Sequence, residues 1–133
     1  IEGDRCKLFF WDIAGQDDFN FLHPMFYKDS KACIIVYSLE ENELGRESYQ
    51  HIKNWNRELN KYCKDIPVVL FANKVDLLNK HNLDKNKIEK IVKDQNFSGY
   101  YITSAKTGQG VIEAFNFIIK ELYYKFKSFS SKK

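Results

Sequence analysis

The chain has 133 residues, of which 44% are hydrophobic and 16% aromatic. This is enough for one domain with a buried core and too little to suggest two. The 21 Lys and Arg against 18 Asp and Glu leave a net charge of only +3, which does not favour a nucleic-acid-binding protein. Neither a membrane-spanning apolar run nor a signal-peptide pattern occurs, so the sequence predicts a soluble protein unless lipid is attached beyond its ends.

The three cysteines, Cys6, Cys33 and Cys63, are odd in number and far apart. That pattern argues against a disulfide framework or a metal site and favours a reducing, cytoplasmic compartment. Lysine is concentrated near residues 85–93 and again at residues 125–133. A solvated helix face and a frayed tail account for this most simply, and attraction to an anionic membrane is the functional alternative.

In chain order, an aromatic-rich strand is predicted at residues 5–12, after a turn at Gly3 and Asp4. The continuous apolar run at residues 32–38 predicts a strand that is covered on both faces. Apolar residues spaced by three and four then predict a helix at about residues 47–63.

A second buried strand is expected at residues 67–73. The spacing of Leu83, Ile88, Ile91 and Val92 predicts another helix, with Asp84 as an acid in its first turn. A strand at residues 99–103 and a broad apolar helix from Val111 to Phe126 complete the pattern.

Alternating strands and helices predict an α/β fold with a doubly wound parallel sheet and helices on both faces. Residues 1–127 are expected to form one domain, and residues 128–133 a disordered tail.

Asp76 is the residue from which a base preference can be argued. It follows Asn73 and Lys74 at the end of a predicted strand. One carboxylate can accept from the ring N–H and the exocyclic amino group of guanine together, whereas adenine lacks that pair of donors. A helix cap or an ordinary loop residue is the simpler alternative, and Ser104, Ala105 and Lys106 further along the chain favour the guanine site. The stems of Lys74 and Lys106 can sandwich the base, and the Ala105 amide can donate to the guanine oxygen.

Asp12, Gly15 and Gln16 predict the phosphate end of the same site. The Asp12 carboxylate can hold a water of a phosphate-bound Mg²⁺. Gly15 permits close approach of its amide to a terminal phosphate, and Gln16 can orient an attacking water. A loop start and a turn are the structural alternatives. Pro24 prevents one long helix after Gln16, which suits either a switch or a plain loop.

These strings resemble the third, fourth and fifth conserved boxes of the Ras superfamily of small GTPases. Trp11 before Asp12 and the runs at residues 26–28 and 34–37 resemble the Rab branch. Ile13 and residues 96–100 are similar to the Rabs of lysosome-related organelles.

The resemblance implies a P-loop-NTPase-like fold that binds GTP or GDP with Mg²⁺, with Gln16 as its catalytic residue. The guanine-binding residues would be Asn73, Lys74, Asp76, Ser104, Ala105 and Lys106, and those at the phosphates Asp12 and Gly15. Residues 13–28 would be the second switch, which effectors, exchange factors and GTPase-activating proteins contact. The protein would cycle from the cytoplasm to endomembranes in vesicle traffic.

The chain departs from the family pattern at both ends. It contains no GxxxxGK[ST] phosphate-binding loop, no first switch and no C-terminal prenylation cysteines. We therefore expect a fragment or N-terminally incomplete form of a Rab-type GTPase, without the first strand and first helix, and a degenerate GTPase-like binding module with no hydrolysis as the alternative. An ATP-using enzyme is disfavoured by Asp76.

As written, the chain is expected to hydrolyse no GTP and to bind it at millimolar affinity at best. The contacts of Asp76 contribute about 3 to 6 kcal/mol, against an association cost on the order of 4 kcal/mol or more. The absent strand is expected to leave a gap beside residues 32–38 or to be compensated, either by pairing with residues 5–12 or by another chain in that space.

Overall fold

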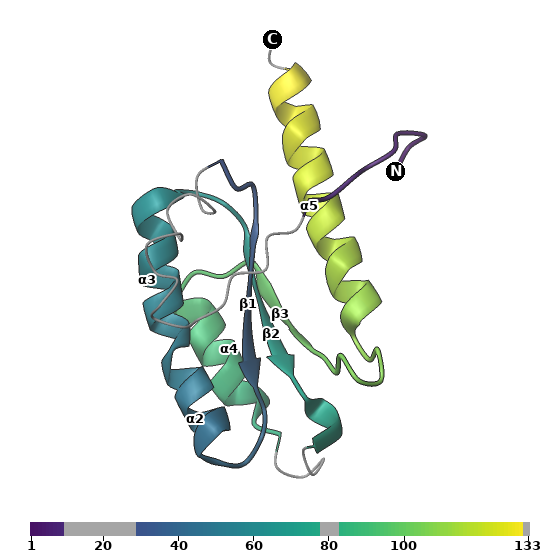
Figure 1. Ribbon diagram of the computed structural model, residues 1–133. Helices are drawn as coiled ribbons and strands as arrows, with labels where there is room; N and C mark the ends of the chain where they lie inside the picture. The colour runs from purple at the N-terminus through teal and green to yellow at the C-terminus, as the bar shows by residue number, and fades with distance from the viewer. Residues whose placement is uncertain (10–28, 78–82, 132–133) are drawn as a thin grey trace.

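The computed structural model describes residues 1–9, 29–77 and 83–131. Within these ranges the strands form a three-stranded parallel sheet in the order β1-β2-β3 (Figure 1). The strands are β1 (Cys33–Ser38), β2 (Val68–Asn73) and β3 (Gly99–Ile102). Their bounds lie within one residue of those that the apolar runs predicted.

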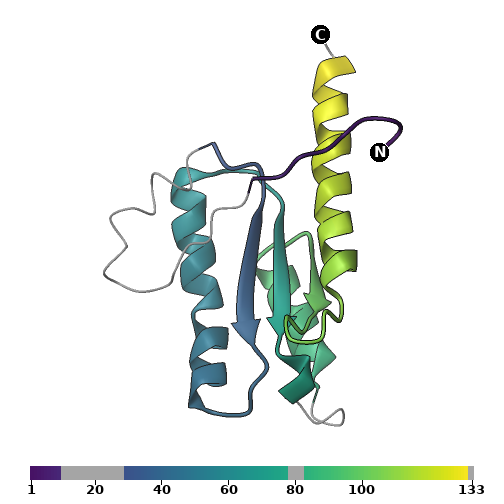
Figure 2. The ribbon, with the colours of Figure 1, turned by 45° about the vertical axis from the view of Figure 1, so that its right-hand side comes forward.

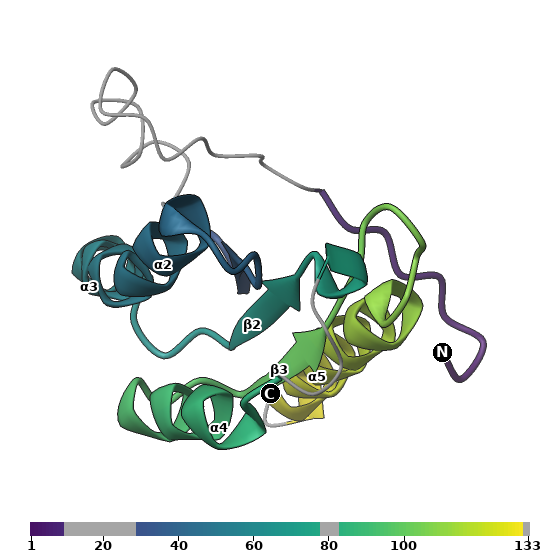
Figure 3. The same cartoon turned by 90° about the horizontal axis from the view of Figure 1, so that it is seen from below.

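Alternate side chains of the central strand enter two separate cores, because successive residues of a strand point to opposite faces. Leu70 and Ala72 pack in the larger core, while Val69 and Phe71 pack in the smaller one. Helices α2 (Glu43–Gln50), α3 (Ile52–Tyr62) and α4 (Lys85–Asp94) lie on the first face, and α5 (Val111–Ser131) lies on the second (Figure 3). The predicted doubly wound architecture is confirmed.

The helix predicted at residues 47–63 is in fact two helices that begin earlier. Asn42 caps α2, since its side chain accepts a hydrogen bond from the Gly45 amide at 2.9 Å. Gly45 is required there, because a Cβ would lie 1.9 Å from the carbonyl oxygen of Glu40. His51 separates α2 from α3. Hydrophobic spacing did not reveal this start, because the first turn of α2 buries only Gly45 and exposes its side chains at 43, 44 and 46.

Asp84 occupies the N-cap of α4 rather than its first turn. Its carboxylate accepts from the Lys87 amide at 3.1 Å, which satisfies one of the free donors at the helix start. An acid at either position interacts favourably with the helix dipole, so the sequence pattern did not distinguish them.

Residues 5–9 form no strand, so that part of the predicted strand at 5–12 is wrong; residues 10–12 lie outside the described ranges. The direct pairing of this segment with β1 is also not found within residues 5–9. A strand persists only where a neighbour accepts its backbone hydrogen bonds, and aromatic content alone does not supply one.

Helix α5 continues to Ser131, although disorder was predicted from Ser128. The prediction rested on the serines and lysines of the tail. A helix that is already nucleated extends at low cost, because each added residue gains one hydrogen bond. Among the described residues, no helix is both long enough and apolar enough to cross a membrane.

The three thiols should differ strongly in reactivity. Cys6 is exposed, and none of the three cysteines, all of which the structure describes, forms a disulfide. Burial, with Cys63 close by, raises the pKa of Cys33 to about 12, and the thiolate is the reactive form. Near pH 8 (about the pKa of a free thiol) we expect Cys6 to react with a thiol reagent well before Cys33 and Cys63.

Timed alkylation followed by mass spectrometry measures this difference. The Cys6→Ser variant should lack the fast phase. Native-state labelling of Cys33 as fast as that of Cys6 would contradict the described packing of β1.

Candidate functional site

The predicted base-binding residues follow the carboxyl ends of β2 and β3. Because these strands are parallel, both ends lie at the same edge of the sheet, where open α/β sheets bind ligands (Figure 1). Ala72 pairs with Ile102, so the next residues, Asn73 and Thr103, lie side by side. The structure thus brings together the two motifs that are 30 residues apart in the chain.

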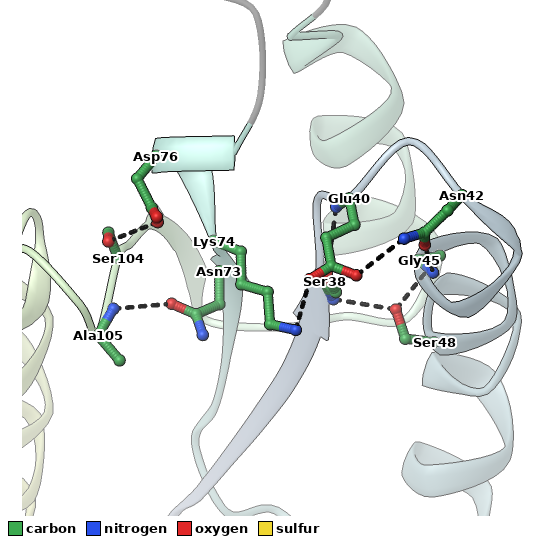
Figure 4. A network of polar contacts seen from close by, with 10 residues as sticks. All are labelled: Ser38, Glu40, Asn42, Gly45, Ser48, Asn73, Lys74, Asp76, Ser104 and Ala105. Carbon is green, nitrogen blue, oxygen red and sulfur yellow. Dashed lines mark hydrogen bonds and ion pairs between the residues drawn. The ribbon is translucent and has the colours of Figure 1, made fainter.

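Asn73 joins the two loops at this edge. Its side-chain oxygen accepts from the Thr103 hydroxyl at 3.0 Å and from the Ala105 amide at 3.2 Å. Figure 4 shows the second of these contacts. Because Thr103 is only 1% exposed, its hydrogen bond anchors the Asn73 side chain to the protein interior. The arrangement holds the chain around Ala105 against the end of β2.

Asp76 lies in a short 3-10 helix, η2 (Val75–Leu77), and its carboxylate is held by Ser104. The Ser104 hydroxyl donates to Oδ1 of Asp76 at 2.7 Å (Figure 4). The Val75 amide also donates to the carbonyl of Thr103 at 3.2 Å, which fixes the backbone beside it. Ser104 is fully buried whereas Asp76 is exposed. The buried hydroxyl therefore orients the Asp76 carboxylate from the interior side, and the carboxylate remains accessible to solvent.

The loop after Ser104 is shaped by its own hydrogen bonds. The Ser104 amide donates to the carbonyl of Gln109 at 3.0 Å, and the Gly108 amide donates to the carbonyl of Ser104 at 2.7 Å. Gly110 has φ +74°, and a Cβ there would lie 2.2 Å from the carbonyl oxygen of Ile102. Glycine is therefore needed at position 110 for both conformation and space. Ala105 and Lys106 are exposed on this loop.

Lys74 is held by an acid that the sequence analysis did not identify. Its Nζ lies 2.7 Å from Oε1 of Glu40, in the loop after β1 (Figure 4). The side-chain Nδ2 of Asn42 donates to Oε2 of Glu40 at 3.1 Å. These two hydrogen bonds hold the pKa of Glu40 below its ordinary value. Lys74 itself has φ +67°, a backbone conformation that is uncommon for a side chain of this kind.

Glu40 could have been found from its position, because it follows β1 as Lys74 follows β2. Ser38 and Asn73 are register partners, and the Leu39 amide donates to the Asn73 carbonyl at 2.8 Å. Lys74 is one residue beyond β2 and Glu40 is two residues beyond β1, so the two side chains start from neighbouring strand ends. Thr103 and Gly110 were missed for a different reason, since their roles depend on side-chain and backbone contacts across the loop.

All of the predicted phosphate end lies outside the described ranges: Asp12, Gly15, Gln16 and the predicted switch at 13–28. In residues 1–9, 29–77 and 83–131 there is no group of three or more His, Cys, Asp or Glu side chains that could hold a metal ion. The described part of the candidate site therefore comprises the residues that the sequence predicts to bind the base.

A doubly wound parallel sheet with polar side chains gathered at its carboxyl edge is an architecture typical of nucleotide-binding proteins. The chain matches the Ras family over residues 1–124 and belongs to it. It is similar to the Ras-related protein Rab-21 of Bos taurus, with 34% identity over 123 residues. It is 33% identical to Rab-21 of Homo sapiens and of Mus musculus over the same length.

Each of these alignments covers 92% of the chain but only 52–53% of the relative. The chain therefore spans about half the length of the curated relatives it matches. The relatives support the Rab branch that the motifs predicted. The narrower resemblance to the Rabs of lysosome-related organelles stays a prediction.

The contacts of Glu40 predict a pH dependence of stability. Its pKa is lower in the folded state than the ordinary value of 4.5, so it stabilises the fold above that value. The contribution is lost as pH falls through the lowered pKa. We expect wild type to be slightly more stable than Glu40→Gln near pH 7, and the difference to shrink as pH falls below 4.5 and to close below the lowered pKa of Glu40.

Thermal unfolding of both proteins between about pH 3 and pH 7 measures this difference. Glu41→Gln, a change at the exposed neighbouring glutamate, is the matched control and should show no such convergence. A gap between wild type and Glu40→Gln that widens on acidification would contradict the described ion pair.

Proposed function

We propose that this chain forms the guanine-binding part of a Rab-type small GTPase, a protein that binds and hydrolyses GTP as a switch in intracellular vesicle traffic. The observation that carries the proposal is the joint fixation of Asn73, Asp76 and Ser104 at the carboxyl edge of the sheet. Family membership supports the same reading.

The residues present fit a guanine base. Asp76 presents an exposed carboxylate whose Oδ1 is oriented by a buried hydroxyl. That carboxylate matches the two adjacent N–H donors of guanine, whereas adenine would leave it without them. Orienting the acceptor in advance reduces the ordering cost of binding, which is the purpose that Ser104 serves here.

The amide of Ala105 supports the same ligand from the opposite loop. Its position is set by the contact with Asn73 at 3.2 Å. Lys74 and Lys106 are both exposed, and their aliphatic stems would cover the two faces of a planar base. The ion pair with Glu40 restricts the rotamers of Lys74, so the aliphatic stem is held in place before the base binds.

For the phosphate end, we propose Asp12 as the holder of a water on Mg²⁺, Gly15 as an amide donor and Gln16 as the residue that orients the attacking water. Mg²⁺ would supply charge neutralisation at the phosphates. Residues 13–28 are proposed as the surface for effectors, exchange factors and GTPase-activating proteins. Localisation is proposed as cytoplasmic, with cycling to endomembranes through a lipidated C-terminus.

Asp76→Asn tests the base assignment in the full-length protein. The amide offers one acceptor and one donor, so it matches guanine poorly and xanthine better. We expect GDP affinity to fall by about 100-fold, since a charge-assisted hydrogen bond contributes about 1.5 to 3 kcal/mol and 1.4 kcal/mol is a factor of ten. Binding of XDP should improve.

Fluorescent-nucleotide titration gives both affinities, and circular dichroism checks that the variant folds. Asp94→Asn, at the end of α4, is the matched control and should bind GDP like wild type. Unchanged GDP affinity in Asp76→Asn would remove this residue from the guanine site.

Gln16→Leu separates binding from hydrolysis in the same protein. The change removes a polar group that can orient water, so single-turnover hydrolysis should slow by at least about tenfold while GDP affinity stays within about twofold. Wild-type protein that binds guanine nucleotide but hydrolyses none would instead support the degenerate binding module. Undiminished hydrolysis in the variant would exclude Gln16 from catalysis.

A further inference from the structure

The loop that joins β1 to α2 lies at the same end of the sheet as the predicted base-binding residues. Figures 1 and 2 show this loop at the same end of the molecule as η2, where the carboxyl ends of the strands meet. In this loop Glu40 forms an ion pair with Lys74, with 2.7 Å between Oε1 and Nζ. An ion pair at the protein surface contributes little to the stability of a fold. Its main effect here is therefore on the position of the Lys74 side chain.

The Glu40 carboxylate is held on both of its oxygens. Oε1 accepts from Lys74, and Oε2 accepts from Nδ2 of Asn42 at 3.1 Å (Figure 4). The Glu40 amide also donates to Oγ of Ser38, the last residue of β1, at 3.1 Å. The Glu40 side chain is only 16% exposed, whereas that of Lys74 is 47% exposed. The acid is therefore the fixed partner of the ion pair, and it determines where the lysine lies.

Helix α2 holds the same loop from its other side. The Ser38 amide donates to Oγ of Ser48 at 2.9 Å, and that hydroxyl donates to the Gly45 carbonyl at 2.7 Å (Figure 4). Gly45 lies so close to the Glu40 backbone that a Cβ would be 1.9 Å from the Glu40 carbonyl oxygen. The loop and the start of the helix therefore cannot move apart without breaking these contacts. Glu40 belongs to a rigid unit made by the end of β1 and by α2.

The backbone of Lys74 fixes the other end of the same side chain. Its φ of +67° is in the left-handed region, and such a conformation persists where the surrounding structure holds it. The Lys74 carbonyl accepts from the Leu77 amide at 2.9 Å, and the Val75 amide donates to the Thr103 carbonyl at 3.2 Å. The backbone thus sets the direction in which the side chain leaves the strand end, and the ion pair sets the position of the ammonium.

Lys106 is the lysine predicted on the other face of the base, and it has no comparable anchor. It is exposed, and no ion pair joins it to another residue in the described part of the chain. A long side chain that is free before binding loses rotamers when a ligand immobilises it, which lowers affinity by a factor of about two to ten. Because Lys74 is already restricted, less of this entropy remains to be lost when a base binds.

We propose that Glu40 is a positioning residue that prolongs the bound state of the guanine nucleotide by holding the stem of Lys74 against the base. The inference rests on the proposed function, and it adds that a residue outside the base-binding set controls the lifetime of the complex. Changes within one binding site act mostly on the rate of dissociation. Loss of the anchor should therefore appear as faster release of nucleotide, while Asp76 still selects the base.

Release of GDP that carries a methylanthraniloyl group on its ribose, chased with excess unlabelled GDP, tests the proposal on the full-length protein. Glu40→Ala should release the nucleotide about three to ten times faster than wild type, with the association rate within about twofold. Glu40→Gln keeps an acceptor for Lys74 without the charge, so its rate should lie between these two. Glu41→Gln, at the exposed neighbouring glutamate, is the matched control and should release GDP like wild type.

A double-mutant cycle shows whether Glu40 acts through Lys74. Lys74→Met keeps an apolar stem and removes the ammonium, so Glu40→Ala should speed release no further in that background. In the Lys106→Met background the effect of Glu40→Ala should remain undiminished, because Lys106 does not take part in the ion pair. A general loosening of the loop would speed release equally in wild type and in both backgrounds, and that result would overturn the proposal.

Unchanged release in both Glu40→Ala and Glu40→Gln would also overturn it. Slower release would do the same, since it would mean that the ion pair draws Lys74 away from the base. Circular dichroism checks that each variant is folded. If wild type binds GDP and Asp76→Asn weakens that binding, such a failure leaves the proposed function standing. Wild type that binds no guanine nucleotide would refute the proposed function and this inference together.

Discussion

The parallel register of β1, β2 and β3 is the constraint on which the described site depends. Ser38, Asn73 and Thr103 stand at or directly beyond the ends of neighbouring strands, in register. A slip of one residue between β2 and β3 would move Thr103 away from Asn73 and also exchange the two faces of the strand. The same hydrophobic alternation that separates the two cores therefore sets the position of the polar side chains at the edge.

Buried hydroxyls connect that register to the exposed ligand-binding groups. Thr103 and Ser104 are almost completely buried, and each donates its hydroxyl proton to a side-chain oxygen. A buried hydroxyl without a partner is costly, so these contacts are strongly selected in the folded state. As a result, the side chains of Asn73 and Asp76, which are both more exposed, are oriented by hydrogen bonds to buried groups.

The sequence predicted the strands well because β1 and β2 are covered on both faces and hence appear as continuous apolar runs. It also predicted that Asp76 and Ser104 lie close together, because residues at the carboxyl ends of neighbouring parallel strands meet at one edge of the sheet. It did not predict Glu40, whose contact with Lys74 depends on the loop after β1, or the lack of a strand at residues 5–9. The Glu40–Lys74 contact and the absence of a strand at residues 5–9 both depend on which backbone segment lies next to the residue in the fold. The pattern of side chains along the sequence carries little information about that neighbour.

The N-terminal residues show how a segment without strand pairing can still be positioned. The Tyr123 hydroxyl of α5 donates to Asp4 at 2.6 Å, and Lys127 pairs with Glu2, whose pKa is lowered by this contact. Hydrogen bonding to Asp4 raises the pKa of Tyr123, which keeps the hydroxyl protonated as the donor. Residues 2–4 are thus attached to the last turns of α5. Contacts made by the end of this helix and the path of the N-terminal segment are therefore physically linked, because both depend on the position of those turns.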